Sequence, residues 1–114
     1  MHGRIESKTW VTPDMVRLEL GGEGLNGFVM PATCDTYVNI ALAPPVAPYG
    51  PVFDPKQVRE RHESKWWPTR RRYTVRSWDE QSRRLTLDFV VHGDTGIAGP
   101  WAASVDVGEV LVFE

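Results

Sequence analysis

The sequence predicts an all-β domain, a six-stranded antiparallel barrel of Greek-key type with one or two short helices. Six short segments have strand-like apolar patterns, turn residues separate them, and one long polar excursion interrupts the series. The expected strands are residues 4–11, 15–20, 37–43, 72–78, 84–91 and 110–113. With 114 residues, of which 41% are hydrophobic, the chain is the size of one domain with a core of its own.

The first three strands differ in how far they should be buried. Residues 15–20 alternate apolar and charged side chains, which is typical of a strand with one wet face. Residues 37–43 are more apolar and should be more buried. A Thr-Pro-Asp turn at 12–14 and the glycines of 21–24 separate these strands.

The excursion from Pro44 to Trp67 is rich in proline, which donates no hydrogen bond to a sheet. Asp54 is a good N-cap, Pro55 suits the first helical position, and Gln57 follows three residues after the cap. The residues that follow are polar on nearly all sides. We expect a short exposed helix or a mobile loop.

A turn at Asp79–Ser82 predicts that the fourth and fifth strands form an antiparallel hairpin. Residues 100–104 are a candidate helical turn, and 105–108 lead into the last strand. Because this strand runs almost into Glu114, we expect the chain to be truncated or to be one module of a longer protein.

The composition favours no charged macromolecular partner. Thirteen basic and fifteen acidic residues give a net charge of −2, which argues against nucleic acid and anionic membranes. The single cysteine, Cys34, excludes an internal disulfide. No secretory signal and no apolar run of roughly 20 residues occurs, so we expect a cytoplasmic location.

The segment Arg71–Arg76 combines guanidinium, phenol and hydroxyl groups on a strand. Alternation places Arg71 and Tyr73 on one face and Thr74 on the other. Arginine suits phosphate because its planar fork gives two parallel hydrogen bonds, tyrosine offers a flat surface, and a threonine hydroxyl both donates and accepts. The alternative is an edge strand with solvated arginines.

The segment from His92 to Trp101 is a glycine-rich turn leading into the possible helix. Gly93, Gly96 and Gly99 permit close backbone approach, and helix N-terminal amides attract anions. The alternative is a connection rich in glycine for geometry alone. His92 has no partner at metal-ligand spacing, so we expect no metal site.

The stretch Lys65–Tyr73 mixes basic and aromatic residues, as single-stranded nucleic-acid-binding surfaces do. A phosphate-bearing cofactor would explain the same residues. The predominance of acidic residues in the rest of the chain argues against nucleic acid as the ligand.

These residues resemble the siderophore-interacting proteins, FAD-dependent ferric-siderophore reductases of the ferredoxin-reductase superfamily. The family pattern Arg-x-Tyr-Thr-x-Arg is matched by Arg71, Tyr73, Thr74 and Arg76. Later family motifs are matched by residues 88–93, 96–102 and 106–109. In the family's glycine-rich turn, Ile97 and Gly99 here replace the commoner Pro and Ser, so anion contacts there would come from backbone amides.

The resemblance implies a ferredoxin-reductase-type FAD-binding domain over residues 1–114. It further implies NAD(P)H as electron donor, bound by a C-terminal nicotinamide domain that this chain lacks, and a ferric siderophore as substrate. Arg71 would pair with the pyrophosphate and Tyr73 would pack on the ring and ribityl chain. Thr74 would reach the ring N5 edge as the catalytic residue, which requires the strand to end or bend. The expected cofactor contacts are Arg71, Tyr73, Thr74, Val75, Arg76, Val90, His92, Gly93, Gly96, Ala98, Gly99 and Trp101. A flavin-binding module without turnover remains the alternative.

Overall fold

A computed structural model describes residues 1–28, 36–44, 46–91 and 97–113. The strands are β1 His2–Thr12, β2 Met15–Gly21, β3 Tyr37–Leu42, β4 Thr69–Asp79, β5 Arg84–Val90 and β6 Val110–Phe113. The helices are α1 Pro55–Arg61 and α2 Ala98–Ser104, with 3-10 turns η1 Glu23–Leu25 and η2 Ser64–Trp66.

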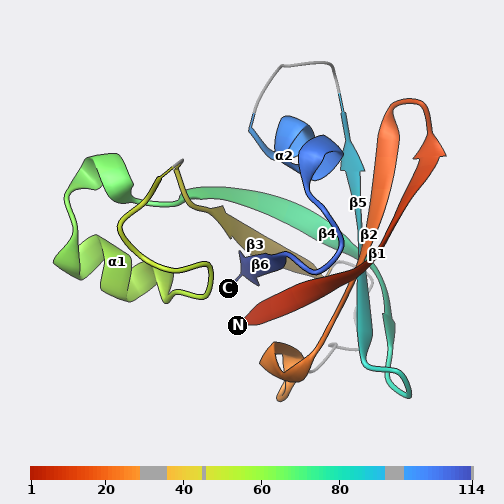
Figure 1. Ribbon diagram of the computed structural model, residues 1–114. Helices are drawn as coiled ribbons and strands as arrows, with labels where there is room; N and C mark the ends of the chain where they lie inside the picture. Colours follow the sequence, from red (N-terminus) through yellow and green to blue (C-terminus); the bar gives the residue numbers. More distant parts are fainter. Residues whose placement is uncertain (29–35, 45, 92–96, 114) are drawn as a thin grey trace.

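The six strands form a closed antiparallel barrel in the order β1-β2-β5-β4-β3-β6 (Figure 1). The short strand β6 closes it by pairing with β1 on one side and β3 on the other. Because strands that neighbour each other in the barrel are not all consecutive in sequence, the topology is of the crossed, Greek-key kind. This confirms the predicted fold class.

The core follows from the alternation of β2 and β5. Every second residue of these strands points inward and is fully buried. These residues are Val16, Leu18, Leu20, Leu85, Leu87 and Phe89. Burial of apolar side chains is worth roughly 1.5–3 kcal/mol each, so this pair of strands supplies much of the barrel's stability.

Strand β4 begins at Thr69, three residues before the predicted start. Its first residues pair with β3, with Thr69 opposite Leu42 and Arg71 opposite Ile40. A run of three arginines has no strand-like alternation, so the pairing with β3 and not local propensity makes these residues extended.

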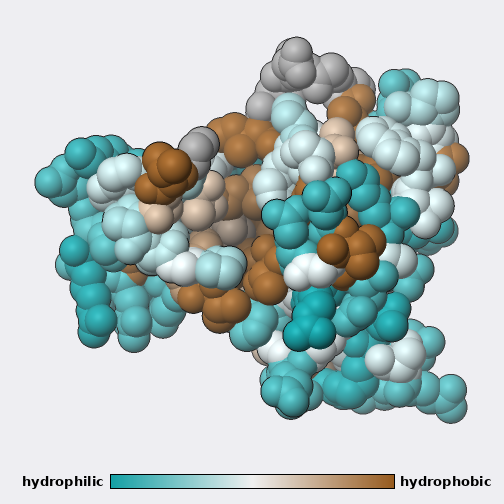
Figure 2. Space-filling view, in the orientation of Figure 1, coloured by the Kyte–Doolittle hydropathy of each residue, from teal (hydrophilic) through white to brown (hydrophobic). Residues whose placement is uncertain are grey.

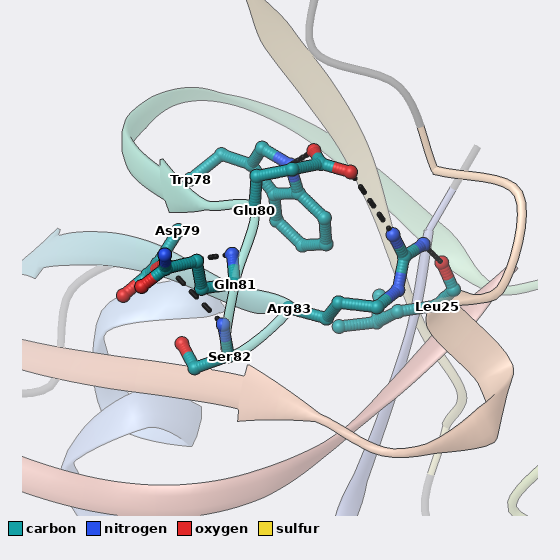
Figure 3. A network of polar contacts seen from close by, with 7 residues as sticks. All are labelled: Leu25, Trp78, Asp79, Glu80, Gln81, Ser82 and Arg83. Carbon is teal, nitrogen blue, oxygen red and sulfur yellow. Dashed lines mark hydrogen bonds and ion pairs between the residues drawn. The ribbon is translucent and has the colours of Figure 1, made fainter.

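The β4–β5 hairpin has an internally bonded turn (Figure 3). The Asp79 carboxylate accepts from the amides of Gln81 and Ser82, at 3.0 and 3.3 Å. The amide of Ser82 is the main cause of the lowered pKa of Asp79. Such side-chain-to-backbone bonds are typical of Asx turns and confirm the predicted turn.

Arg83 then fixes the hairpin to the barrel. Its φ of 53° lies in the left-handed region, which turns the chain into β5. Its guanidinium contacts Glu80 at 3.3 Å, donates to the Leu25 carbonyl at 3.1 Å and lies over the Trp78 ring. Figure 3 shows Trp78 and Arg83 on the same side of the turn.

The excursion between β3 and β4 carries α1 and projects from the barrel (Figure 1). Asp54 caps α1 by accepting from the Lys56 amide at 3.0 Å, as its N-cap position predicts. The excursion is held together by its own residues: the Tyr49 ring packs on Phe53 and His62, and the Tyr49 hydroxyl donates to the Trp66 carbonyl. The described part of the excursion is therefore structured.

Apolar residues lie between this excursion and the barrel (Figure 2). They line a small groove of about 150 Å³ that includes Phe53 from the excursion, Leu42 from β3 and Trp101 from α2. The excursion is thus placed beside β3 and β6.

Helix α2 covers one end of the barrel. It begins at Ala98, two residues before the predicted Pro100, because proline is tolerated in the first helical turn. Ala98 and Ala102 are buried in the core. Lys8 of β1 holds the other end of α2, since its ammonium donates to the carbonyls of Ala103 and Val105 at 2.7 and 2.9 Å.

Lys8→Met should lower the free energy of unfolding by about 1–3 kcal/mol, because it removes two charge-assisted hydrogen bonds. Urea denaturation should show a lower midpoint with an unchanged slope. Lys56→Met, at an exposed position on α1, is the matched control and should leave the midpoint unchanged. Equal midpoints for both variants would contradict the anchoring role of Lys8.

Candidate functional site

The candidate site lies where β4 and β5 part. The two strands pair from Asp79 opposite Arg84 to Val75 opposite Leu87. Beyond this point β4 continues along β3 and β5 continues along β2, with no ladder pair between residues 69–74 and 88–90. The parted strands border a groove of about 520 Å³ that opens to solvent. Its lining residues are Arg72, Tyr73, Thr74, Val75, Arg76, Asp88 and Val90.

A β-bulge lies at the mouth of the groove. Val75 is opposite Leu87 but Ser77 is opposite Thr86, so Arg76 is the extra residue. A bulge bends its strand and re-aims the side chains on either side. The strand irregularity that the binding prediction requires is therefore present, immediately after Thr74.

The backbone of Thr74 faces the groove. The Val75 amide donates to the Thr36 carbonyl at 3.0 Å, so the peptide groups of Val75 point toward β3. Because successive peptide groups on a strand point to opposite sides, those of Thr74 point toward β5, where the ladder is interrupted. Its side chain is exposed. Thr74 thus offers both backbone and hydroxyl groups to a ligand in the groove.

On the inner face of β4, Tyr73 belongs to a row of three aromatic rings. Its ring centroid lies 4.5 Å from that of Phe89, which lies 5.8 Å from Trp101 of α2. Burial is the main cause of the raised pKa of Tyr73, and the nearby charge of Arg71 partly opposes it. Tyr73 is half-buried and presents only part of its ring to the groove. Trp101 is partly buried and packs against the core.

Arg71 is exposed, and its guanidinium donates to the Arg70 carbonyl at 2.8 Å. This bond uses one of five N–H groups, so most of its donors are available for an anion. Arg71 lies two residues before Tyr73 on the same side of the strand, as predicted.

The outer face of β4 carries two further arginines with defined partners. The Arg72 guanidinium lies 4.3 Å from the Tyr37 ring centroid, a cation–π contact with the neighbouring strand. Arg76 lies 3.6 Å from the Asp88 carboxylate of β5. Asp88 also accepts two bonds from Arg17 of β2, at 2.8 and 3.1 Å. The hydrogen bond with Asp88 is the main cause of the raised pKa of Arg17.

The first turn of α2 packs directly against the end of β5. Ala98 and Gly99 are buried, and a Cβ at Gly99 would lie 3.0 Å from the Val90 carbonyl oxygen. The Val91 amide is bonded to the Asp14 carbonyl at 2.7 Å. The glycine at position 99 is therefore explained by helix–strand packing.

The structure brings the predicted site residues together in two sets. Thr74, Val75, Arg76 and Val90 line the groove with Tyr73. Arg71 is on the same strand, two residues before Tyr73, and is not among the lining residues. Ala98, Gly99 and Trp101 lie in α2 at the adjoining barrel end. His92, Gly93 and Gly96 lie outside the described residues.

Arg72, Asp88 and Arg17 were not predicted as site residues. Arg72 and Asp88 line the groove, and Arg17 holds Asp88 from the neighbouring strand. The sequence offered one signal: Arg17 and Asp88 are opposite charges on the wet faces of two predicted strands. Their contact depends on the register of β2 with β5, which places them directly opposite each other.

Comparison with known proteins identifies the family. The family model for the siderophore-interacting FAD-binding domain matches residues 4–114. The chain belongs to this family. The groove fits the cofactor of such a domain, because its lining combines the guanidinium groups of Arg72 and Arg76 with the exposed hydroxyl of Thr74.

Two relatives share substantial sequence with the chain. Ferric vibriobactin reductase ViuB of Vibrio cholerae is 34% identical over 107 residues, which cover 91% of this chain and 38% of ViuB. A siderophore utilization protein from T. fusca, known from its crystal structure, has 30% sequence identity to this chain and a TM-score of 0.77. The match covers 99% of this chain and 42% of the T. fusca chain.

The siderophore-interacting protein SipS from Aeromonas hydrophila has the same fold, with a TM-score of 0.78 at 22% identity, covering 100% of this chain and 41% of SipS. The chain thus spans about two fifths of the length of these family members. None of the helices in the described part of the chain is long and apolar enough to cross a membrane. Residues 1–28, 36–44, 46–91 and 97–113 contain no cluster of three potential metal ligands.

Gly99→Ala should destabilise the protein by about 1–3 kcal/mol, since the new methyl group would press on the Val90 carbonyl and overpack the helix–strand contact. This strain should exceed the gain in helix propensity, which is about 1 kcal/mol. Thermal unfolding should show a lower Tm. Gly50→Ala is the control, because nothing lies within 4 Å of a Cβ at that position. A Tm for Gly99→Ala at or above wild type would contradict the close packing.

Proposed function

We propose that this chain is the FAD-binding domain of an NAD(P)H-dependent ferric-siderophore reductase. The observation that carries the proposal is the groove between β4 and β5, in a chain of this FAD-binding family. Its lining includes five of the residues expected to contact flavin: Tyr73, Thr74, Val75, Arg76 and Val90. The rest of the reductase, including a nicotinamide-binding domain, would lie in sequence beyond these 114 residues.

Each part of FAD has a candidate partner. Arg71 would bind the pyrophosphate through its unused donors, and Tyr73 would pack against the ring and ribityl chain. Thr74 would place its hydroxyl and backbone groups at the N5 edge of the ring. Val75, Arg76 and Val90 would complete the wall, and the segment around His92, Gly93, Gly96, Ala98 and Gly99 would adjoin the phosphates.

The protein's contribution would be to bind and orient the cofactor. When bound, FAD supplies the conversion of a hydride equivalent into single electrons. Thr74 would hold the reacting edge of the ring by a hydrogen bond whose direction can reverse, because a hydroxyl both donates and accepts. The exposed side chains of Thr74, Arg76 and Val90 leave the outer side of the groove open. A bulky ferric siderophore could approach from that side as the electron acceptor.

The printed activity of one relative supports this substrate class. ViuB is named a ferric vibriobactin reductase, and the T. fusca protein is named for siderophore utilization. A flavin-binding module without turnover is the alternative. Titration of the chain with FAD should produce a bound flavin spectrum in either case. Reduction of a ferric siderophore by NAD(P)H, measured with the full-length protein, separates the two, and an inactive full-length protein would favour the module.

Arg71→Ala should weaken FAD binding by about tenfold to a hundredfold, since loss of a hydrogen bond to a charged group costs about 1.5–3 kcal/mol. Isothermal titration with FAD measures the change. Arg4→Ala is the matched control, because it removes an exposed arginine from β1, which does not neighbour β4 in the barrel. FAD affinity equal to wild type in Arg71→Ala would remove Arg71 from the site.

Thr74→Val preserves the shape of the side chain and removes its hydroxyl. It should change the flavin reduction potential more than the affinity for oxidised FAD, because the hydrogen bond at N5 differs between redox states. Spectroelectrochemistry of the FAD-loaded protein measures the potential. Thr9→Val, at an exposed position of β1, should change neither quantity. If Thr74→Val also changed neither, Thr74 would have no role at the ring.

A further inference from the structure

A single carboxylate lies between two arginines at the wall of the groove. Asp88 of β5 is flanked by Arg17 of β2 and Arg76 of β4, so the contact spans three neighbouring strands. Asp88 and Arg76 both line the groove. We call these three residues the charge triad.

The two arginines are held differently. The Arg17 Nε and Nη2 atoms donate to both carboxylate oxygens, at 2.8 and 3.1 Å, which is a bidentate pair. Arg76 lies 3.6 Å from one of the same oxygens, a distance too long for a hydrogen bond. Within the described residues, Asp88 is the charged partner of Arg76, and the Arg76 side chain is 61% exposed. Its guanidinium therefore keeps its donors for the groove.

The charges of the triad do not cancel. Two guanidinium groups against one carboxylate leave an excess of one positive charge beside the groove. The carboxylate is only 18% exposed, so water screens it less than it screens Arg76. A second ion pair, Glu19 with Arg84 at 3.7 Å, joins β2 and β5 outside the groove and provides a control.

We propose that Asp88 is a redox-tuning residue of the flavin site: as the shared counter-charge of Arg17 and Arg76, it sets the net positive charge beside the ring. This inference rests on the proposed FAD binding. FAD that has gained two electrons and one proton carries an additional negative charge on its ring. A positive charge beside the ring stabilises that form relative to the oxidised one. Removing the Asp88 carboxylate would stabilise reduced FAD further relative to oxidised FAD, and removing the Arg76 guanidinium would stabilise it less.

The test measures two quantities for the whole chain: the Kd for oxidised FAD, and the reduction potential of the chain once it is loaded with FAD. Asp88→Asn should increase the affinity for reduced relative to oxidised FAD by about three- to tenfold, because it leaves one more uncompensated positive charge at the groove. A tenfold change corresponds to a potential about 30 mV higher for a two-electron couple. Glu19→Gln, which removes the carboxylate of the control pair, should leave the potential unchanged.

Two more variants separate charge from structure. Arg76→Gln should lower the reduction potential by about as much as Asp88→Asn raises it. The double variant Asp88→Asn with Arg76→Gln restores the net charge of the wild type and should return the potential toward the wild-type value. A purely structural role would instead weaken binding of both redox forms together and leave the potential in place.

Opposite shifts in the single variants, with recovery in the double variant, would support the proposal. Shifts in the same direction, or unchanged potentials in FAD-loaded variants, would overturn it while leaving FAD binding intact. If Asp88→Asn does not fold, Arg76→Gln decides, and a potential that does not fall overturns the proposal. A wild-type chain that binds no FAD would overturn both this inference and the proposed function.

Discussion

The site depends on one constraint, the parting of β4 from β5 beyond Val75. Between Leu85 and Leu87, β5 pairs with β2 on one edge and with β4 on the other. Beyond Val75 the two strands part, because β4 continues along β3 as far as Thr69 while β5 continues along β2 as far as Val90. Each strand then has one edge without a ladder partner, so the groove is bordered by backbone groups that a bound ligand can satisfy.

The parted strand divides the site chemically into two faces. On the inner face, Tyr73 joins the aromatic row that leads through Phe89 to α2, so a ligand there would meet rings fixed by the core. On the outer face lie Arg76 and Asp88, whose charges are set by contacts across strands. A ligand that spans phosphates, a ribityl chain and a flat ring needs both kinds of surface, and the bulge at Arg76 lies where the two faces meet.

The sequence predicted what depends on local pattern. Alternation in β2, the turn at Asp79 and the N-cap at Asp54 were confirmed because each is decided within a few residues. The early start of β4 was missed, and a bend near Thr74 was expected without its form or position, since the start and the bulge at Arg76 both depend on pairing with distant strands. Asp88 was missed as a site residue for the same reason, because only the register of three strands brings it to the groove with its two arginines.

The exposure of the groove links cofactor binding to charge tuning. In the free protein, Arg76 is largely exposed, and an ion pair in water contributes about 0–1 kcal/mol. A ring lying in the groove would displace that water, lower the local dielectric constant and strengthen the effect of the same charges on the ring. The contact of Arg76 with Asp88 would therefore contribute little to the stability of the empty barrel, and the charges of the triad would have a strong effect on the reduction potential of a bound flavin. In this way Arg76, whose ion pair adds little to the stability of the fold, would still affect the electron affinity of a bound flavin.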